Sequence, residues 1–301
     1  MMKAKNLIKR VTIGILAVVL STSVVWADDN PGLIQRAKDA CKNATYDIPT
    51  VTNDIDGWPQ GPAIMCDSAV VMEAESGEVL YNKAMDERRY PASTTKIMTA
   101  LVALEHSNLT DTVTFTAEGL KEAVPGNSYV TPVIQEGETL TMEQCLYAIM
   151  LVSGNEVSTQ VAMQVGGSVE GFVEMMNERA ASLGLHDTNF ANPSGLPDDS
   201  HYTTARELAI ITAHALENNT FREIVSSESA KVPYNNNPNG RTLKNHNKLL
   251  YMYDSTIGVK TGFTKKAGRC LVSAAQRDGV TLICVTLNDG DDWNDHMSAF
   301  D

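Results

Sequence analysis

The sequence predicts one domain of the α/β class, of the α+β type, in which a five-stranded sheet carries a large helical insertion. Two strand-like apolar runs come early, at Ala69–Met72 and Val79–Tyr81, and three come late, at Thr256–Thr261, Leu271–Ala275 and Thr281–Leu287. The strongest patterns between them are helical. The early and late runs can share one sheet only if the two ends of the domain meet, and a site between sheet and helices follows from that layout.

Four apolar helices are predicted in the middle of the chain. Cys145–Val152 and Glu156–Val165 are apolar runs, and Val169–Leu183 repeats apolar residues at three- and four-residue spacing before the stop signal Gly184. The fourth follows Thr204-Ala205-Arg206-Glu207, a capping-box pattern.

The five cysteines do not suggest a disulfide framework, because their number is odd and small. A two-residue hairpin turn at Asp278-Gly279 would set Cys270 opposite Leu287 and Cys284 opposite Ser273. The two thiols would then point to opposite faces of the sheet. We therefore expect no bridge between them.

The N-terminal 27 residues have the pattern of a secretory signal peptide. Basic residues between Lys3 and Arg10 precede an uncharged apolar run at Val11–Val25, and Ala27 ends a plausible cleavage site. An uncleaved anchor is the alternative, although the run is shorter than the roughly 20 residues of a spanning helix. Residues 28–62 are polar and turn-rich and predict a loosely ordered segment, which leaves 63–301 as the main folded domain.

The formal net charge is −13 at pH 7. Such a surface repels phosphate backbones, so nucleic acid is not an expected partner. The six histidines show no ligand spacing, so neither a metal nor another cofactor is predicted.

Three short motifs carry chemistry. In Ser93-Thr94-Thr95-Lys96, at the start of an apolar helix, the lysine lies one turn after the serine, and a neutral amine there could take the hydroxyl proton. Ser153-Gly154-Asn155 separates two predicted apolar helices and presents a hydroxyl and an amide at their junction. Lys260-Thr261-Gly262 ends a predicted strand and could hold a carboxylate. Taken singly, the three also fit a helix cap, a turn and a strand end.

In this order the motifs resemble the active-site signature of the penicillin-binding and serine β-lactamase superfamily. Longer stretches look like low-molecular-weight D-alanyl-D-alanine carboxypeptidases: Ser76–Tyr81, Pro91–Ala100, Asn192–Leu196 and Gly258–Gly268. The resemblance covers about Ala63 to Asp292. It implies a transpeptidase-like fold with an antiparallel five-stranded sheet between helices, and an exported enzyme acting on peptidoglycan stem peptides.

The resemblance also implies roles for single residues. Ser93 would attack the bond between the two terminal D-alanines, with Lys96 as its base and Ser153 as the proton shuttle. Asn155 would bind the substrate amide carbonyl, while Lys260 and Thr261 would fix the terminal carboxylate next to Gly262. The backbone N–H groups of Ser93 and Phe263 would form the oxyanion hole.

Departures from the family pattern leave some points open. Relatives usually continue into a β-rich domain and an amphipathic tail, whereas this chain stops at Asp301. His246 lies where some relatives carry an arginine beside the substrate, and an ordinary loop histidine is the alternative.

Two rival functions share the scaffold, a β-lactamase and a catalytically silent penicillin-binding sensor. A class A β-lactamase would need a deacylating glutamate, and no Glu-x-x-Leu-Asn stretch follows Asn155. We therefore expect β-lactam antibiotics to trap the protein as covalent inhibitors rather than to be consumed. The sensor alternative is disfavoured because all the polar groups needed for acylation are present.

Overall fold

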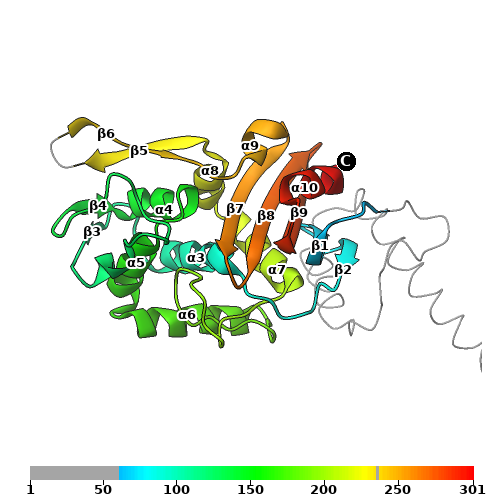
Figure 1. The fold of residues 1–301 in the computed structure, drawn as a ribbon, viewed down its shortest axis with the longest axis horizontal. Helices are drawn as coiled ribbons and strands as arrows, with labels where there is room; N and C mark the ends of the chain where they lie inside the picture. The colour runs from blue at the N-terminus through cyan, green and yellow to red at the C-terminus, as the bar shows by residue number, and fades with distance from the viewer. Residues whose placement is uncertain (1–60, 235–236) are drawn as a thin grey trace, which may run out of the picture. The chain divides into compact units, whose positions relative to one another are not determined.

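A computed structural model describes residues 61–234 and 237–301 of the chain. Its main sheet has the strand order β2-β1-β9-β8-β7, and all neighbouring strands pair antiparallel (Figure 1). The early and late strands therefore meet in one sheet, as predicted, and each is longer than the apolar run that indicated it: β1 Cys66–Glu73, β2 Val79–Lys83, β7 Thr256–Thr264, β8 Gly268–Arg277 and β9 Val280–Asp289.

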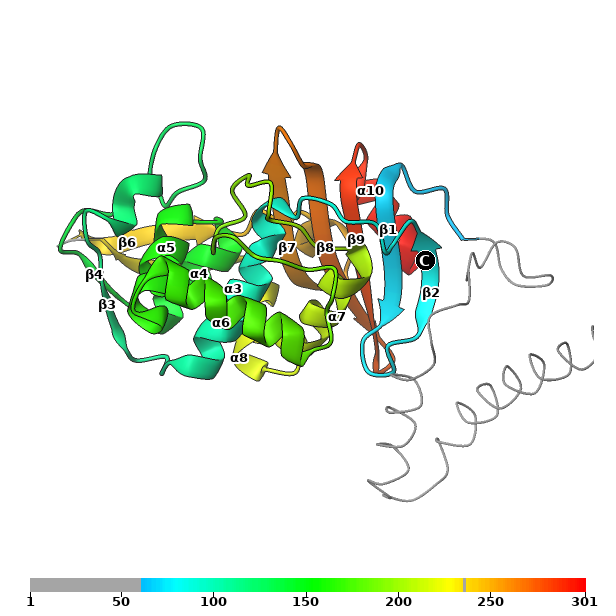
Figure 2. The ribbon, with the colours of Figure 1, turned by 90° about the horizontal axis from the view of Figure 1, so that it is seen from below.

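Helices pack on both faces of this sheet (Figure 2). Helices α7 and α8 contact strands on one face, with the rest of the helical insertion beyond them, and α10 packs against β8 and β9 on the other face. The described helices are α3 Lys96–His106, α4 Met142–Leu151, α5 Asn155–Gly166, α6 Val169–Ser182, α7 Ala205–Leu216, α8 Asn219–Ser226, α9 Leu249–Met252 and α10 Asp292–Phe300, with short 3₁₀ turns η3 Ala92–Thr95 and η4 Gly119–Glu122. The four helices predicted in the middle of the chain are confirmed as α4 to α7, and the apolar helix predicted after Ser93 is confirmed as α3.

Two further two-stranded sheets were not predicted from the sequence. They are β3 Thr112–Thr114 with β4 Thr139–Thr141, and β5 Ser229–Tyr234 with β6 Asn237–Lys244. The first pair is too short to show a period, and β6 contains Pro238 and Gly240, residues that usually interrupt strands.

The hairpin register agrees with the prediction. Cys270 pairs with Leu287 and Cys284 with Ser273, around a turn in which Asp278 and Gly279 both have positive φ. Positive φ at both turn positions matches the right-handed twist of a two-residue hairpin. Four cysteines in the described part of the chain, Cys66, Cys145, Cys270 and Cys284, are buried and free.

The capping box predicted ahead of α7 is only half formed. The Thr204 hydroxyl accepts a hydrogen bond from the backbone N–H of Glu207 at 3.1 Å, but the Glu207 carboxylate instead accepts from the N–H groups of His186 and Asp187. Glu207 therefore joins α7 to the preceding loop rather than closing its own cap.

The predicted signal peptide and nearly all of the predicted 28–62 segment lie outside the described residues. Among the residues that the structure describes, no helix combines the length and apolar character needed to cross a membrane.

Candidate functional site

Ser93 lies in the turn η3, directly before α3. The preceding residue, Ala92, has φ +49°, and the Thr94 hydroxyl donates to the Pro91 carbonyl at 2.7 Å, so the turn is held in a tight, strained shape. Two glycines press against it. A Cβ on Gly195 would lie 1.8 Å from the Ala92 carbonyl oxygen, and one on Gly262 would lie 3.0 Å from the Ser93 nitrogen. The close approach of the backbones requires glycine at position 195, whereas a Cβ at position 262 would fit only if the turn gave way by a few tenths of an ångström.

Lys96 is fully buried behind Ser93. Its Nζ lies 3.1 Å from the Ser93 Oγ and donates to the Asn155 Oδ1 at 2.7 Å and to the Ser194 carbonyl at 2.5 Å. Burial, reinforced by the charge of Lys260, lowers the pKa of Lys96 well below its usual value. A neutral amine in contact with a hydroxyl is the arrangement needed for general-base activation of a serine.

Lys260 supplies the second amine from strand β7. Its side chain is buried, its Nζ donates to the Thr261 carbonyl at 2.9 Å, and burial lowers its pKa to about 7. Strand β7 continues to Thr264, so the Lys260-Thr261-Gly262 motif lies within the strand and not at its end as predicted. The strand continues because Gly262, Phe263 and Thr264 still pair with β8.

Ser153 and Asn155 lie at the junction of α4 and α5. Ser153 has φ +62° and is 3% exposed, and its Oγ has no hydrogen-bond partner. A buried hydroxyl without a partner is costly in a folded protein, which makes it a candidate for a contact with substrate. Asn155 begins α5, and its backbone N–H donates to the Ser128 carbonyl at 2.9 Å.

The segment from Ala191 to His201 supports the nucleophile from the side of α3. The Thr99 hydroxyl donates to the Pro193 carbonyl at 2.7 Å, and the His201 Nε2 lies 2.7 Å from the Thr95 Oγ1. The Ala191 N–H donates to the His201 Nδ1, so that ring nitrogen carries no proton and Nε2 is the donor. Burial lowers the pKa of His201 to about 4.

A cleft of about 440 Å³ opens over Ser93. It brings together six of the nine predicted site residues: Ser93, Ser153, His246, Thr261, Gly262 and Phe263. The other three, Lys96, Asn155 and Lys260, are buried and do not line it. His246 is exposed at the rim, and partial desolvation together with the charge of Lys260 lowers its pKa.

Seven lining residues were missed in the sequence analysis. Gly126, Asn127 and Ser128 come from the loop before β4, and Arg269, Cys270, Asp292 and Trp293 come from β8 and the start of α10. The Pro125-Gly126-Asn127-Ser128 stretch reads only as a turn. Arg269 and Trp293 carry no motif, so the sequence offered no signal for them.

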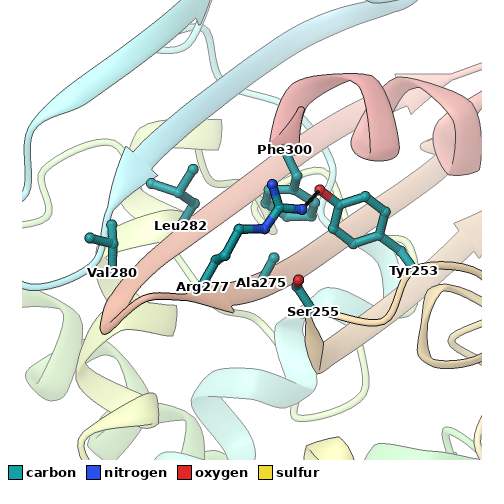
Figure 3. A pocket seen from close by; sticks show the side chains of 7 residues that line it. All are labelled: Tyr253, Ser255, Ala275, Arg277, Val280, Leu282 and Phe300. Atoms are coloured by element: carbon teal, nitrogen blue, oxygen red, sulfur yellow. Dashed lines mark hydrogen bonds between the residues drawn. The ribbon is translucent and has the colours of Figure 1, made fainter.

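A second, smaller hollow of about 120 Å³ lies on the α10 side of the sheet (Figure 3). The Arg277 guanidinium donates to the Tyr253 hydroxyl beside it at 2.6 Å, and Val280, Leu282 and Phe300 add apolar walls. None of the predicted site residues lines this hollow. Within 61–234 and 237–301, no three His, Cys, Asp or Glu side chains are grouped to hold a metal ion, so the expected absence of a metal stays a prediction.

Comparison with known proteins identifies relatives of both the sequence and the fold. Residues 57–291 match the family model for D-alanyl-D-alanine carboxypeptidases. The carboxypeptidase DacF of Bacillus subtilis is 35% identical over 225 residues, 73% of this chain and 56% of that protein. This chain therefore spans just over half the length of that relative.

Solved structures agree with this result. A Streptomyces DD-transpeptidase superposes with a TM-score of 0.74 at 34% identity, covering 80% of this chain and 99% of the other. A D-alanyl-D-alanine carboxypeptidase from Mycobacterium tuberculosis gives a TM-score of 0.75 at 30% identity, covering 81% and 93%. The predicted transpeptidase-like fold is confirmed.

Proposed function

Because the chain belongs to the D-alanyl-D-alanine carboxypeptidase family, we propose that it removes the terminal D-alanine from peptidoglycan stem pentapeptides through an acyl-enzyme on Ser93. The observation that carries this proposal is the contact of the buried Lys96 amine with the Ser93 hydroxyl, at 3.1 Å. The lowered pKa of Lys96 keeps a fraction of that amine neutral at working pH.

In the acylation step, the Ser93 Oγ attacks the carbonyl between the two terminal D-alanines while neutral Lys96 takes the hydroxyl proton. The oxyanion forms beside the backbone N–H groups of Ser93 and Phe263, which come from two chain segments that Gly262 allows to approach. The proton that Lys96 took from Ser93 then passes through the Ser153 hydroxyl, which has no other partner, to the leaving amine. D-alanine leaves, and water then hydrolyses the ester on Ser93.

The substrate is held by groups on both sides of the cleft. Asn155 already accepts from Lys96 through Oδ1, which leaves its amide N–H groups for the substrate carbonyl. Thr261 and Gly262 line the cleft beside the terminal carboxylate, with His246 at the rim. Lys260, whose Nζ donates to the Thr261 carbonyl, places positive charge beside that carboxylate and beside Lys96.

The substrate fixes the place of action. Peptidoglycan lies outside the cytoplasmic membrane, so the chain is exported and works on the cell-wall side. Penicillin, whose reactive amide mimics the D-alanyl-D-alanine bond, acylates Ser93 and stays attached.

The test follows free D-alanine from diacetyl-Lys-D-Ala-D-Ala together with labelling by a fluorescent penicillin. Wild type releases D-alanine and is labelled, and Ser93→Ala does neither. Ser107→Ala is the matched control, because Ser107 ends the same helix, α3, and its hydroxyl bonds only the Ala103 carbonyl. A wild-type protein that releases no D-alanine, or that turns over penicillin rapidly, contradicts the proposal.

A further inference from the structure

One buried carboxylate beside the site has no part in the mechanism above. Glu156 directly follows Asn155 in the first turn of α5 and is fully buried. Its Oε1 accepts a hydrogen bond from the backbone N–H of Val130 at 2.7 Å, whereas its Oε2 has no partner. A buried carboxylate with only one of its oxygens satisfied is unfavourable for stability alone.

The bond to Val130 reaches the wall of the cleft. Two hydrogen bonds join the first turn of α5 to that wall, one from the Asn155 N–H to the Ser128 carbonyl and one from the Val130 N–H to Glu156. Gly126, Asn127 and Ser128 of the same loop line the cleft. Glu156 therefore fixes the cleft wall to the residue that contacts Lys96.

Charge provides the second link to the site. The carboxylate of Glu156 raises the pKa of Lys96 against the larger effects of burial and Lys260, and Glu122 adds a smaller contribution in the same direction. Burial raises the pKa of Glu156, and the backbone N–H of Val130 and then the charge of Lys96 offset part of that rise. From the packed helix α4, Cys145 faces the same carboxylate, and burial raises the pKa of that thiol so far that it stays neutral.

We propose that Glu156 is a positioning residue. It holds the Ser128–Val130 wall of the cleft against the first turn of α5, and its negative charge stabilises the protonated form of the buried Lys96. The inference rests on the proposed function of Lys96 as the base. It assigns to one side chain a structural task, which any hydrogen-bond acceptor can perform, and an electrostatic task, which needs a negative charge.

Two substitutions separate these tasks. Glu156→Gln keeps an acceptor for the Val130 N–H but removes the charge, so the acid limb of the pH–kcat/KM profile moves to lower pH by about half a unit or more. The acid limb moves in this direction because Lys96 loses its proton more readily when no negative charge lies nearby. Glu156→Ala also loses the acceptor, so KM for diacetyl-Lys-D-Ala-D-Ala rises by about tenfold in addition.

The matched control is Glu170→Gln, because Glu170 occupies the first turn of the neighbouring helix α6 but is exposed. We expect Glu170→Gln to change neither the acid limb of the pH–kcat/KM profile nor KM. An unmoved acid limb in Glu156→Gln, or an unmoved KM in Glu156→Ala, overturns the proposal. Thermal unfolding shows whether Glu156→Ala is folded, and Glu156→Gln tests the electrostatic task in either case. The wild-type rate alone tests the proposed function, so the two failures are distinguishable.

Discussion

Ser153 shows how this site departs from what stability alone would select. It combines a left-handed backbone with a buried hydroxyl that lacks a partner. Left-handed backbone costs of order 1 kcal/mol for a residue with a Cβ, and an unsatisfied buried hydroxyl adds to that cost. Both costs are understandable if the hydroxyl must face the substrate rather than the protein.

We expect Ser153→Ala to lower kcat/KM for D-alanine release by about 100-fold, because the leaving amine loses its proton donor. The same change removes an unsatisfied polar group, so the melting temperature stays constant or rises. The assay for D-alanine and a thermal unfolding curve measure the two effects on one preparation.

Ser158→Ala provides the comparison, since the Ser158 hydroxyl is also buried but donates to the Gly154 carbonyl at 2.9 Å. This variant loses about 1 kcal/mol of unfolding free energy and keeps most of its activity. A Ser153→Ala protein that is clearly less stable than wild type would show that its hydroxyl is a structural group.

At the scale of elements, two glycines with similar backbone angles have different tasks. Gly195 has φ +83° and Gly77 has φ +72°, so alanine is strained at both positions. A Cβ on Gly195 would also collide with the turn that carries Ser93, whereas a Cβ on Gly77 meets nothing within 4 Å.

Gly195→Ala should therefore displace the nucleophile and slow penicillin acylation by about 100-fold or more. Gly77→Ala carries the strain alone and acylates at the wild-type rate, with a loss of stability of about 1 kcal/mol. The acylation rate of each variant is measured with a fluorescent penicillin by quenching the reaction at successive times. Equal rates for the two variants would exclude a positioning role for Gly195.

The elements also show where sequence reasoning succeeds. The strands of the sheet and helices α3 to α7 were predictable because each contains an apolar run or an apolar period along the sequence. The β3–β4 and β5–β6 strand pairs were not, since the first pair is very short and β6 carries a proline and a glycine. The site divides in the same way: the motif residues have local signatures, but Arg269 and Trp293 reach the cleft only through the fold.

At the scale of the molecule, two buried histidines hold distant segments together in their neutral form. His201 connects the Ala191 backbone to Thr95, and His296 on α10 contacts the hydroxyls of Ser273 on β8 and Thr286 on β9. Burial lowers their pKa values to about 4 and about 3, while Asp198 raises and Lys96 lowers that of His201.

The sign of the pH dependence follows from these values. An unfolded histidine takes up a proton near pH 6.5, whereas the folded state resists it until about pH 4 or below. The stability that each histidine contributes is thus complete above pH 6.5 and is lost as the pH falls from there toward 4. Asp289 and Glu156 work in the opposite direction, because burial raises the pKa of Asp289 to about 6 and also raises that of Glu156, so their protonation on acidification favours the folded state.

We therefore expect the unfolding free energy to fall between pH 6.5 and 4.5, by at most about 1.4 kcal/mol per pH unit for each histidine. Urea unfolding of His296→Gln should show a shallower fall than wild type by about 1 kcal/mol per unit, whatever its stability at pH 7. His106→Gln, at the exposed end of α3, keeps the wild-type slope. If His296→Gln and wild type lose stability in parallel, neutral His296 is not what ties α10 to the sheet, and the acid sensitivity must arise elsewhere.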